Sequence, residues 1–300
     1  MDIWSNTDFP YQCLIDTRRT SALRTAIHSV VRRGDTVLDV GAGSGILAFF
    51  AAEAGASEVY AVEISSLLAR DLVRSVREND LTSVITVLQG DVCSAPLPES
   101  IDVCICELMD TGLMDEMQVP VINTLHEKGV IGPHTKIIPS RYDTFLEPGF
   151  SDFSYYGFKV LAPRHDWPYC TINDPGWSVS EFRPLSDATL LHTVDFTQRI
   201  DSDVDRHICM RAHQDGLVNA IRFSAQAHLN GDLILGATNA LNGDKVVSVQ
   251  PYRVLAGETL HVHVAYRMGG GLESLQVTVA DGEAMYASGE HQRSLRNKEW

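Results

Sequence analysis

The sequence predicts an α/β protein with two domains, a Rossmann-like domain over residues 1–140 and an all-β, barrel-like domain over residues 141–288. Before Pro139, short apolar strands alternate with segments of helical periodicity, which is typical of a parallel sheet covered by helices on both faces. After Pro139 the helical periodicity fades, and short β-rich runs are separated by turn residues. A glycine-rich turn at residues 41–45, between the first strand and the next helix, fits the same fold.

The elements of the first domain follow one another in the order that such a sheet requires. Apolar residues between positions 14 and 33 recur at close to a 3.6-residue period, which predicts an amphipathic helix leading into the first strand. The expected strands are Thr36–Val40, Val59–Glu63, Ile85–Gln89 and Asp102–Glu107, and the further helices are Ile46–Ala54, Leu67–Asn79 and Val119–Glu127.

The second domain is expected to be an antiparallel β structure that opens with a strand at Arg141–Leu146. Asn230-Gly231 and Asn242-Gly-Asp244 are hairpin signals within it. A segment at about residues 162–184, rich in Pro, Trp, Tyr and Gly, is expected to be an arm, and residues 289–300 a solvated tail. Trp167, Tyr169 and Trp177 in this arm either pack it, which we favour, or form an aromatic substrate wall. The other expected strands are Leu190–Phe196, His207–Ala212, Asn219–Leu229, Asp232–Leu235, Lys245–Val249, Thr259–Tyr266 and Ser274–Val279.

Composition restricts the partners and the location of the chain. A net charge of −15 repels nucleic-acid phosphates, so no nucleic-acid partner is expected. The same field would steer a cationic substrate inward, although acidity also serves solubility alone. No apolar run approaches the roughly 20 residues that cross a bilayer. The N-terminus lacks the basic and apolar regions of a signal peptide, so a cytoplasmic location without membrane partners is expected.

Two sets of residues in the sequence are potential metal ligands, the cysteines and a pair of histidines. The six cysteines contain no C-x-x-C pair and no zinc-ligand spacing. His261 and His263 lie on one face of an expected strand, as metal-binding H-x-H pairs do, but no third ligand has a convincing spacing. We therefore expect no metal site, and we favour a structural role for both histidines.

The pattern Asp39-x-Gly41-x-Gly43-x-Gly45 follows an apolar strand and opens a helix. Its spacing favours a methyltransferase over a nicotinamide dinucleotide binder, so S-adenosylmethionine is the expected cofactor. The three glycines would let the backbone pass close to the methionyl and ribose portions. Asp39 would meet the ammonium group of the cofactor, directly or through water.

Two further acids are candidate cofactor ligands. Glu63, which ends the second strand, is placed to accept hydrogen bonds from both ribose hydroxyls. Asp91 follows the third strand and suits recognition of the adenine amine. The alternative for Asp91 is a helix cap.

Four acids, Glu107, Asp110, Asp115 and Glu116, leave the fourth strand in one loop. Burying them without a cation would be costly. A metal ion is one candidate, but nothing nearby supplies the mixed ligand set that would argue for one. A guanidinium fits better, because two carboxylates that each accept a bidentate pair match its planar fork.

On these residues the sequence resembles the protein arginine methyltransferases, a family of class I methyltransferases. Glu107 and Glu116 have the nine-residue spacing of the two glutamates in the family's "double-E" hairpin. The sequence between them looks most like that of the monomethylating, type III branch. Leu14-Ile-Asp-Thr-Arg-Arg-Thr20 is similar to the family motif that would put Arg19 on the cofactor carboxylate. Ile137-Ile-Pro-Ser-Arg141 and Tyr155-Tyr-Gly-Phe158 are similar to segments that lead into the family's β-barrel.

The resemblance implies methyl transfer from S-adenosylmethionine to a guanidinium nitrogen, with Glu107 and Glu116 as the catalytic pair, and it implies a possible homodimer. Three features depart from the family, and the first is Pro10, which stands where the family has a histidine. Thr238-Asn-Ala-Leu-Asn-Gly-Asp244 lacks the His and Trp of the family's T-H-W loop, and the arm is short. The substrate is therefore a protein, a peptide or a small guanidine. The alternatives are another acceptor (an amine, carboxylate or hydroxyl) and a catalytically silent binding protein.

Overall fold

The computed structural model describes residues 8–168 and 181–280. Their first part is a five-stranded parallel sheet in the order β3-β2-β1-β4-β5. It is built from β1 (Thr36–Val40), β2 (Glu58–Glu63), β3 (Ile85–Gln89), β4 (Val103–Cys106) and β5 (Lys136–Ile138). The strand order reverses between β1 and β4, so the carboxyl ends of these central strands form the edge at which a ligand is expected in an open α/β sheet.

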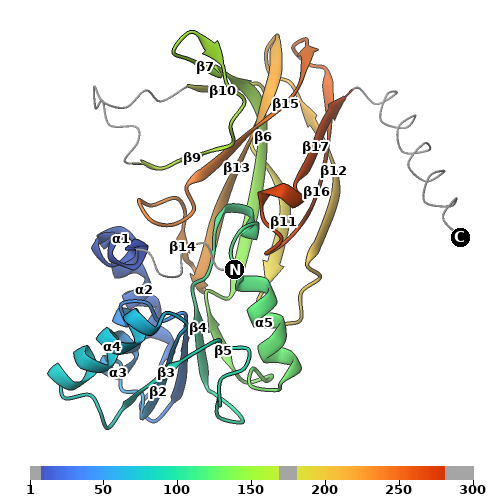
Figure 1. Ribbon diagram of the computed structural model, residues 1–300. Helices are drawn as coiled ribbons and strands as arrows, with labels where there is room; N and C mark the ends of the chain where they lie inside the picture. Colours follow the sequence, from blue (N-terminus) through green and yellow to red (C-terminus); the bar gives the residue numbers. More distant parts are fainter. Residues whose placement is uncertain (1–7, 169–180, 281–300) are drawn as a thin grey trace, which may run out of the picture.

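Helices cover both faces of this sheet. The helices α3 (Ile46–Glu53) and α4 (Ser66–Glu78) lie to one side of the strands, and α5 (Gln118–Glu127) lies to the other (Figure 1). The central strands β1 and β4 are almost wholly buried because they are covered twice, which explains their continuous apolar sequences.

The predicted helix over residues 14–33 is two helices, α1 (Phe9–Ile15) and α2 (Thr17–Val30). Asp16 separates them, and its carboxylate accepts a hydrogen bond of 3.1 Å from the backbone N–H of Arg19. This is an N-cap of α2, which the periodicity of the apolar residues alone does not show. Pro10 lies in the first turn of α1, where its missing N–H costs no hydrogen bond.

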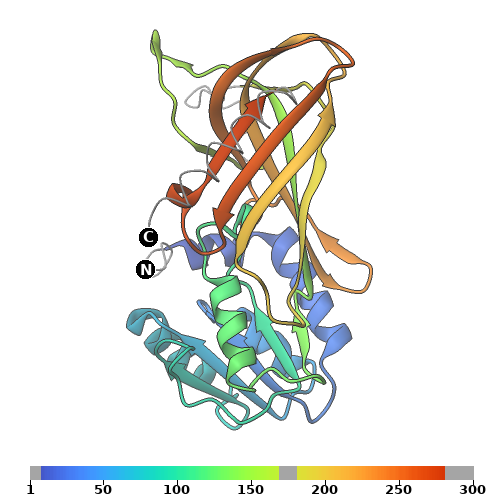
Figure 2. The ribbon, with the colours of Figure 1, turned by 90° about the vertical axis from the view of Figure 1, so that its right-hand side faces the viewer.

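The second part is antiparallel and β-rich, so the predicted fold class is confirmed. A seven-stranded sheet contains β6 (Arg141–Ser151), β9 (Arg164–Asp166), β10 (Phe182–Pro184), β11 (Thr189–Asp195), β13 (Gly216–Asn230), β14 (Leu233–Leu235) and β15 (Asp244–Val254). A three-stranded sheet contains β12 (Asp203–Arg211), β16 (Thr259–Arg267) and β17 (Gln276–Ala280). The two sheets curve around a common interior, and Figure 2 shows the three-stranded one across the front of this part.

The predicted arm does not stand apart over its described length. At one end β9 pairs with β15, and at the other end β10 pairs with β6, so both are strands of the seven-stranded sheet. Residues 169–180, with Tyr169 and Trp177, lie outside the described part of the chain, as does the tail predicted for residues 289–300. Between β6 and β9, the hairpin of β7 (Ser154–Tyr155) and β8 (Phe158–Lys159) projects from the sheet (Figure 1).

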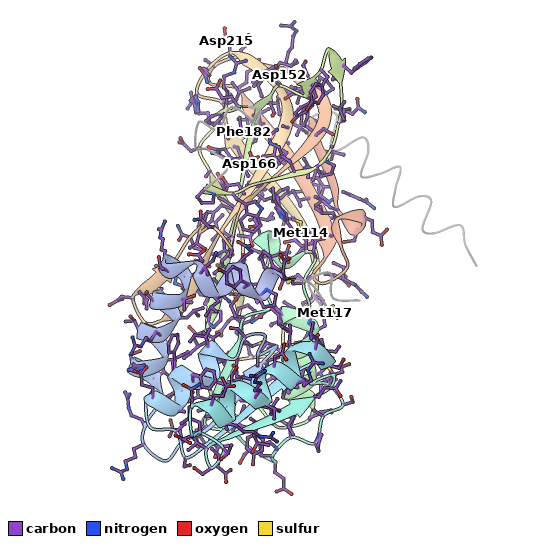
Figure 3. All side chains as sticks on the ribbon, turned by 60° about the vertical axis from the view of Figure 1, so that its left-hand side comes forward. Met114, Met117, Asp152, Asp166, Phe182 and Asp215 are labelled. Atoms are coloured by element: carbon purple, nitrogen blue, oxygen red, sulfur yellow. The ribbon has the colours of Figure 1, made fainter. Side chains whose placement is uncertain are left out.

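One large hydrophobic core runs through both parts of the described chain, and Phe153, Ala220 and Val246 form a small separate cluster. The change of sheet lies between Ile138 and Tyr142, and both residues are fully buried in that core. Met114 and Met117 lie at the level where the two parts meet (Figure 3). They flank Glu116, so the acidic loop is held between the parallel sheet and the β-rich part.

Among the described residues, every helix is too short or too polar to span a lipid bilayer.

Candidate active site

A cavity opens at the carboxyl ends of β1, β2 and β4, where the strand order reverses. Of the candidate residues, Arg19, Gly41, Gly43, Glu63, Glu107 and Glu116 line it. The helix α1 closes one side of this cavity through Phe9, Pro10 and Cys13. Asp39, Gly45 and Asp91 are not among the lining residues.

The glycine turn brings backbone into the wall of the cavity. Gly41, Gly43 and Gly45 have φ values of +67°, +53° and +80°, which a residue with a Cβ adopts only under strain. A Cβ on Gly41 would lie 2.6 Å from Cδ2 of Leu108, and one on Gly45 would overlap the side chain of Leu72. Gly45 therefore serves the packing of α3 against α4, while Gly41 and Gly43 face the cavity.

Glu63 is locked at the end of β2 by two backbone donors. The N–H of Gly43 donates to Oε2 at 2.8 Å, and the N–H of Ser65 donates to Oε1 at 2.7 Å. These bonds fix the carboxylate in one orientation beside the glycine turn. Each oxygen has a second lone pair available for a ligand hydroxyl.

Two buried polar atoms near the cavity have no protein partner among the described residues. They are Oδ2 of Asp39, on β1, and Nε of Arg19, on α2. Burial raises the pKa of Asp39 to about 7, and the nearby Glu63 adds to this, while Arg19 opposes it. An unpartnered carboxyl and an unpartnered guanidinium N–H are the groups that the ammonium and carboxylate of an amino acid would satisfy, so this region fits the methionyl end of S-adenosylmethionine.

Binding of a cationic cofactor near Asp39 is expected to weaken as the pH falls below about 7. The carboxyl must be ionised to attract the ammonium, so below its pKa a proton must first be removed. We expect the dissociation constant of S-adenosylmethionine to rise up to tenfold per pH unit between about pH 7 and pH 5. Calorimetric titration across this range measures it, and Asp39→Asn should bind weakly with a flat profile. An unchanged slope in Asp39→Asn would assign the dependence to another group.

Glu107 and Glu116 come together although nine residues separate them. Glu107 directly follows β4, Glu116 lies in the loop before α5, and both side chains line the cavity. Oε2 of Glu107 forms an ion pair with Nη2 of Arg19, and both side chains are less than 10% exposed. The ion pair therefore connects Glu107, a candidate catalytic residue, to Arg19, a candidate cofactor ligand. It leaves Oε1 of Glu107 available to a ligand.

A second, smaller cavity adjoins the first, and four residues line both, namely Phe9, Met109, Glu116 and Ala240. Beyond Glu116 it is walled by His165 and Trp167, whose ring centroids lie 5.4 Å apart. Burial lowers the pKa of His165 to about 4, so this imidazole is neutral at physiological pH. The sequence leaves Trp167 as either a substrate wall or packing of the arm, with packing favoured, and gives no sign of His165, because β9 reaches the acidic loop only through its pairing with β15.

The remaining two acids of the loop do not point to a ligand. Lys245, only 1% exposed, donates to the carboxylates of Asp110 and Asp115 and offsets part of their negative charge. Tyr142 and Tyr266 secure the same loop by donating to the backbone oxygens of Asp110 and Gly112, at 3.0 Å and 2.8 Å. Grouping all four acids as one site was therefore wrong for this pair, which holds the loop in place.

Asp91 is exposed, and its Oδ1 accepts a hydrogen bond of 2.8 Å from the N–H of Cys93. The bond lies in a turn, and no helix lies in the described residues between β3 and β4, so the helix cap that the sequence left open as an alternative is wrong. The assignment of Asp91 to the adenine stays a prediction.

The fold and the cavity define a class I, S-adenosylmethionine-dependent methyltransferase. Residues 18–171, just over half of the chain, match the family model described as ribosomal protein L11 methyltransferase (PrmA). The chain belongs to the methyltransferase family that this model describes, and it is similar over part of its length to proteins named histone-arginine methyltransferase CARMER and protein arginine N-methyltransferase 6.

Two relatives and one solved structure illustrate the match. An uncharacterised protein of Methanocaldococcus jannaschii is 28% identical over 90% of this chain and 95% of its own length. Protein arginine N-methyltransferase 6 of Xenopus tropicalis is 40% identical over 48% of this chain. The alignment covers only 43% of that relative, so the chain spans less than half of its length. A Trypanosoma brucei PRMT1 enzyme-prozyme heterotetrameric complex with AdoHcy has a similar fold, with a TM-score of 0.69, 19% identity, and coverage of 90% of this chain and 96% of that one.

Proposed function

We propose that this protein transfers the methyl group of S-adenosylmethionine to a nitrogen of an arginine guanidinium. The observation that carries the proposal is the meeting of Glu107 and Glu116 in one cavity, beside the backbone of Gly41 and Gly43. Two carboxylates on neighbouring walls suit a planar group with several N–H donors. They suit a carboxylate acceptor poorly because like charges repel.

The cofactor is held in this proposal by residues with unused polar groups. Arg19 and Asp39 take its carboxylate and ammonium, and Glu63 takes the ribose hydroxyls. When bound, S-adenosylmethionine supplies an electrophilic methyl group on a sulfonium. The adenine assignment of Asp91 and the type III branch remain predictions within the proposal.

Glu107 and Glu116 orient the guanidinium in the proposed reaction. Arginine has a pKa of about 12.5–13.8, so it arrives protonated and its nitrogens are weak nucleophiles. Hydrogen bonds to the two carboxylates concentrate lone-pair character on one nitrogen, and one carboxylate takes the proton that this nitrogen loses as the new N–C bond forms. Positioning the nitrogen in line with the bond between the sulfonium sulfur and the methyl carbon, which breaks in the transfer, supplies much of the acceleration.

The test combines binding and transfer. Titration with S-adenosylmethionine should give saturable binding, and methyl counting should then show transfer to free arginine, to an arginine-rich peptide or to proteins of a cell lysate. A labelled guanidine supports the proposal and decides between a small and a protein acceptor. Cofactor binding with transfer only to a non-guanidine group would overturn the arginine assignment.

In this proposal the acceptor guanidinium binds in the smaller cavity, which Trp167 and Glu116 both line. We expect Trp167→Ala to raise KM for the guanidine about tenfold, since a cation over an indole contributes roughly 1–2 kcal/mol when desolvated. The affinity for S-adenosylmethionine should stay unchanged because Trp167 lines only the smaller cavity. Trp167→Phe keeps a ring packed on Gly243 and should lose less. Equal losses of cofactor and acceptor affinity would instead indicate a packing role.

A homodimer in the cytoplasm remains part of the proposal. The hairpin of β7 and β8 supports self-association, because Tyr156 is 99% exposed and Phe158 is 72% exposed at its tip. The sedimentation coefficient of the purified chain tests it, and a monomer at micromolar concentration would remove it.

A further inference from the structure

The outer face of the three-stranded sheet gathers side chains that ligate metals. Residues alternate between the two faces of a strand, so Asp205, His207 and Cys209 of β12 share the outer face. His261 and His263 of β16 lie on the same face, because the register pairs His207 with His263 and Cys209 with His261. None of these residues lines the cofactor cavity or the acceptor cavity.

The strand pairing supplies the ligands that spacing along the chain could not show. His263 was considered with His261 alone, and no third ligand was found near them in the sequence. In the structure Asp205 and His207 come from a strand more than fifty residues earlier, and they face His263 directly. His261 lies outside this cluster, so the expected H-x-H pair does not form it, and the expectation of no metal site stays a prediction.

Asp205, His207 and His263 already have near-coordinating geometry. Their ligand atoms all lie within 4.8 Å of one another, and Nε2 of His263 lies 2.8 Å from Oδ1 of Asp205. The rings of His207 and His263 are stacked, with centroids 4.2 Å apart and an interplanar angle of 11°. Ligands bound at about 2.0–2.2 Å around a tetrahedral ion lie roughly 3.3–3.6 Å from one another, so small side-chain rotations would complete the site.

We propose that Asp205, His207 and His263 bind one divalent transition-metal ion, with zinc as the expected occupant and water as the remaining ligand. Two imidazoles and one carboxylate are a ligand set suited to such ions, whereas calcium and magnesium prefer oxygen ligands alone.

The ion would fasten β12 to β16. The strand β16 continues beyond this site to the acidic loop, where Tyr266 donates to the backbone oxygen of Gly112. A ligand that binds the native state alone raises its stability by mass action, by about 2.7 kcal/mol at a concentration 100 times the dissociation constant. Zinc is therefore expected to raise the melting temperature of the protein.

The test is titration of the full chain with Zn²⁺, and with Co²⁺ as a spectroscopic probe. One ion per chain should bind, with Co²⁺ absorption typical of imidazole ligation and a raised melting temperature. His207→Gln and His263→Gln should each weaken binding at least tenfold and abolish the thermal shift.

His261→Gln is the matched control, because this histidine shares the face and the H-x-H motif but lies outside the three-residue cluster. It should bind within about threefold of the original chain. Loss of binding in His261→Gln equal to that in His207→Gln would overturn the assignment of ligands. Failure of the original chain to bind one ion would overturn the site itself. Neither result decides whether the protein transfers methyl groups, because no residue of the cluster lines the cofactor cavity or the acceptor cavity.

Discussion

Glu116→Gln is expected to lower kcat for methyl transfer by about 10²-fold or more while leaving the affinity for S-adenosylmethionine within about threefold. The amide has nearly the same shape as the carboxylate but carries no charge. The amide can no longer balance the positive charge of the guanidinium, and it cannot take a proton from that group. Because Arg19 pairs with Glu107 rather than with Glu116, the cofactor side of the cavity should stay intact. Rapid-quench methyl transfer with a saturating guanidine, alongside calorimetry of cofactor binding, measures the two effects separately.

Glu107→Gln is the informative comparison, because it should impair both steps. It removes the same charge from the acceptor and also breaks the ion pair that positions Arg19. We expect a similar fall in kcat together with weaker cofactor binding. If Glu116→Gln retained most of its activity, or if both variants lost only cofactor affinity, the guanidinium-orienting role of the pair would be refuted.

The local pattern of the chain was enough to predict the parallel-sheet part. Strands buried on both faces read as continuous apolar runs, and the turn at residues 41–45 follows β1 as expected. Glu63 and Glu107 could be singled out for a related reason, whereas Glu116, in the loop before α5, could be singled out only by its spacing from Glu107 and by the family resemblance. Parallel strands place their carboxyl ends at one edge, so acids that end successive strands must meet there.

Residues that enter the sites through antiparallel pairing could not be predicted in the same way. His165 and Trp167 reach the acidic loop because β9 pairs with β15, and Asp205 faces His263 because β12 pairs with β16. These registers depend on contacts between distant segments, which a single sequence does not specify. Lys245 is the clearest case, because a lysine at the start of an expected barrel strand gives no local sign that it pairs with two acids 130 or more residues earlier.

Lys245→Met should lower the free energy of unfolding by about 3–5 kcal/mol, the cost of leaving buried charges without their partner. Asp110 is only 7% exposed, and burial already raises its pKa although Lys245 opposes this. The loop should loosen as well. Oδ1 of Asp110 accepts the N–H groups of Asp115 and Glu116, both at 3.0 Å, so displacement of Asp110 would move Glu116 and reduce methyl transfer. Urea unfolding and the methyl-transfer rate measure the two consequences.

The triple variant Lys245→Met/Asp110→Asn/Asp115→Asn separates lost charge balance from lost packing. Methionine fills much of the volume of the lysine stem, and each asparagine keeps a side-chain oxygen for the backbone N–H groups that the aspartates now bind. With no unpaired charge left, most of the lost stability should return, as replacement of a buried ion cluster by neutral groups of similar volume is often nearly neutral. If the triple variant is no more stable than Lys245→Met, the deficit lies in the packing around residue 245 rather than in the two carboxylates. If Lys245→Met alone unfolds at the same urea concentration as the original chain, these acids do not need the lysine, and the loop must be held by its contacts with Tyr142 and Tyr266.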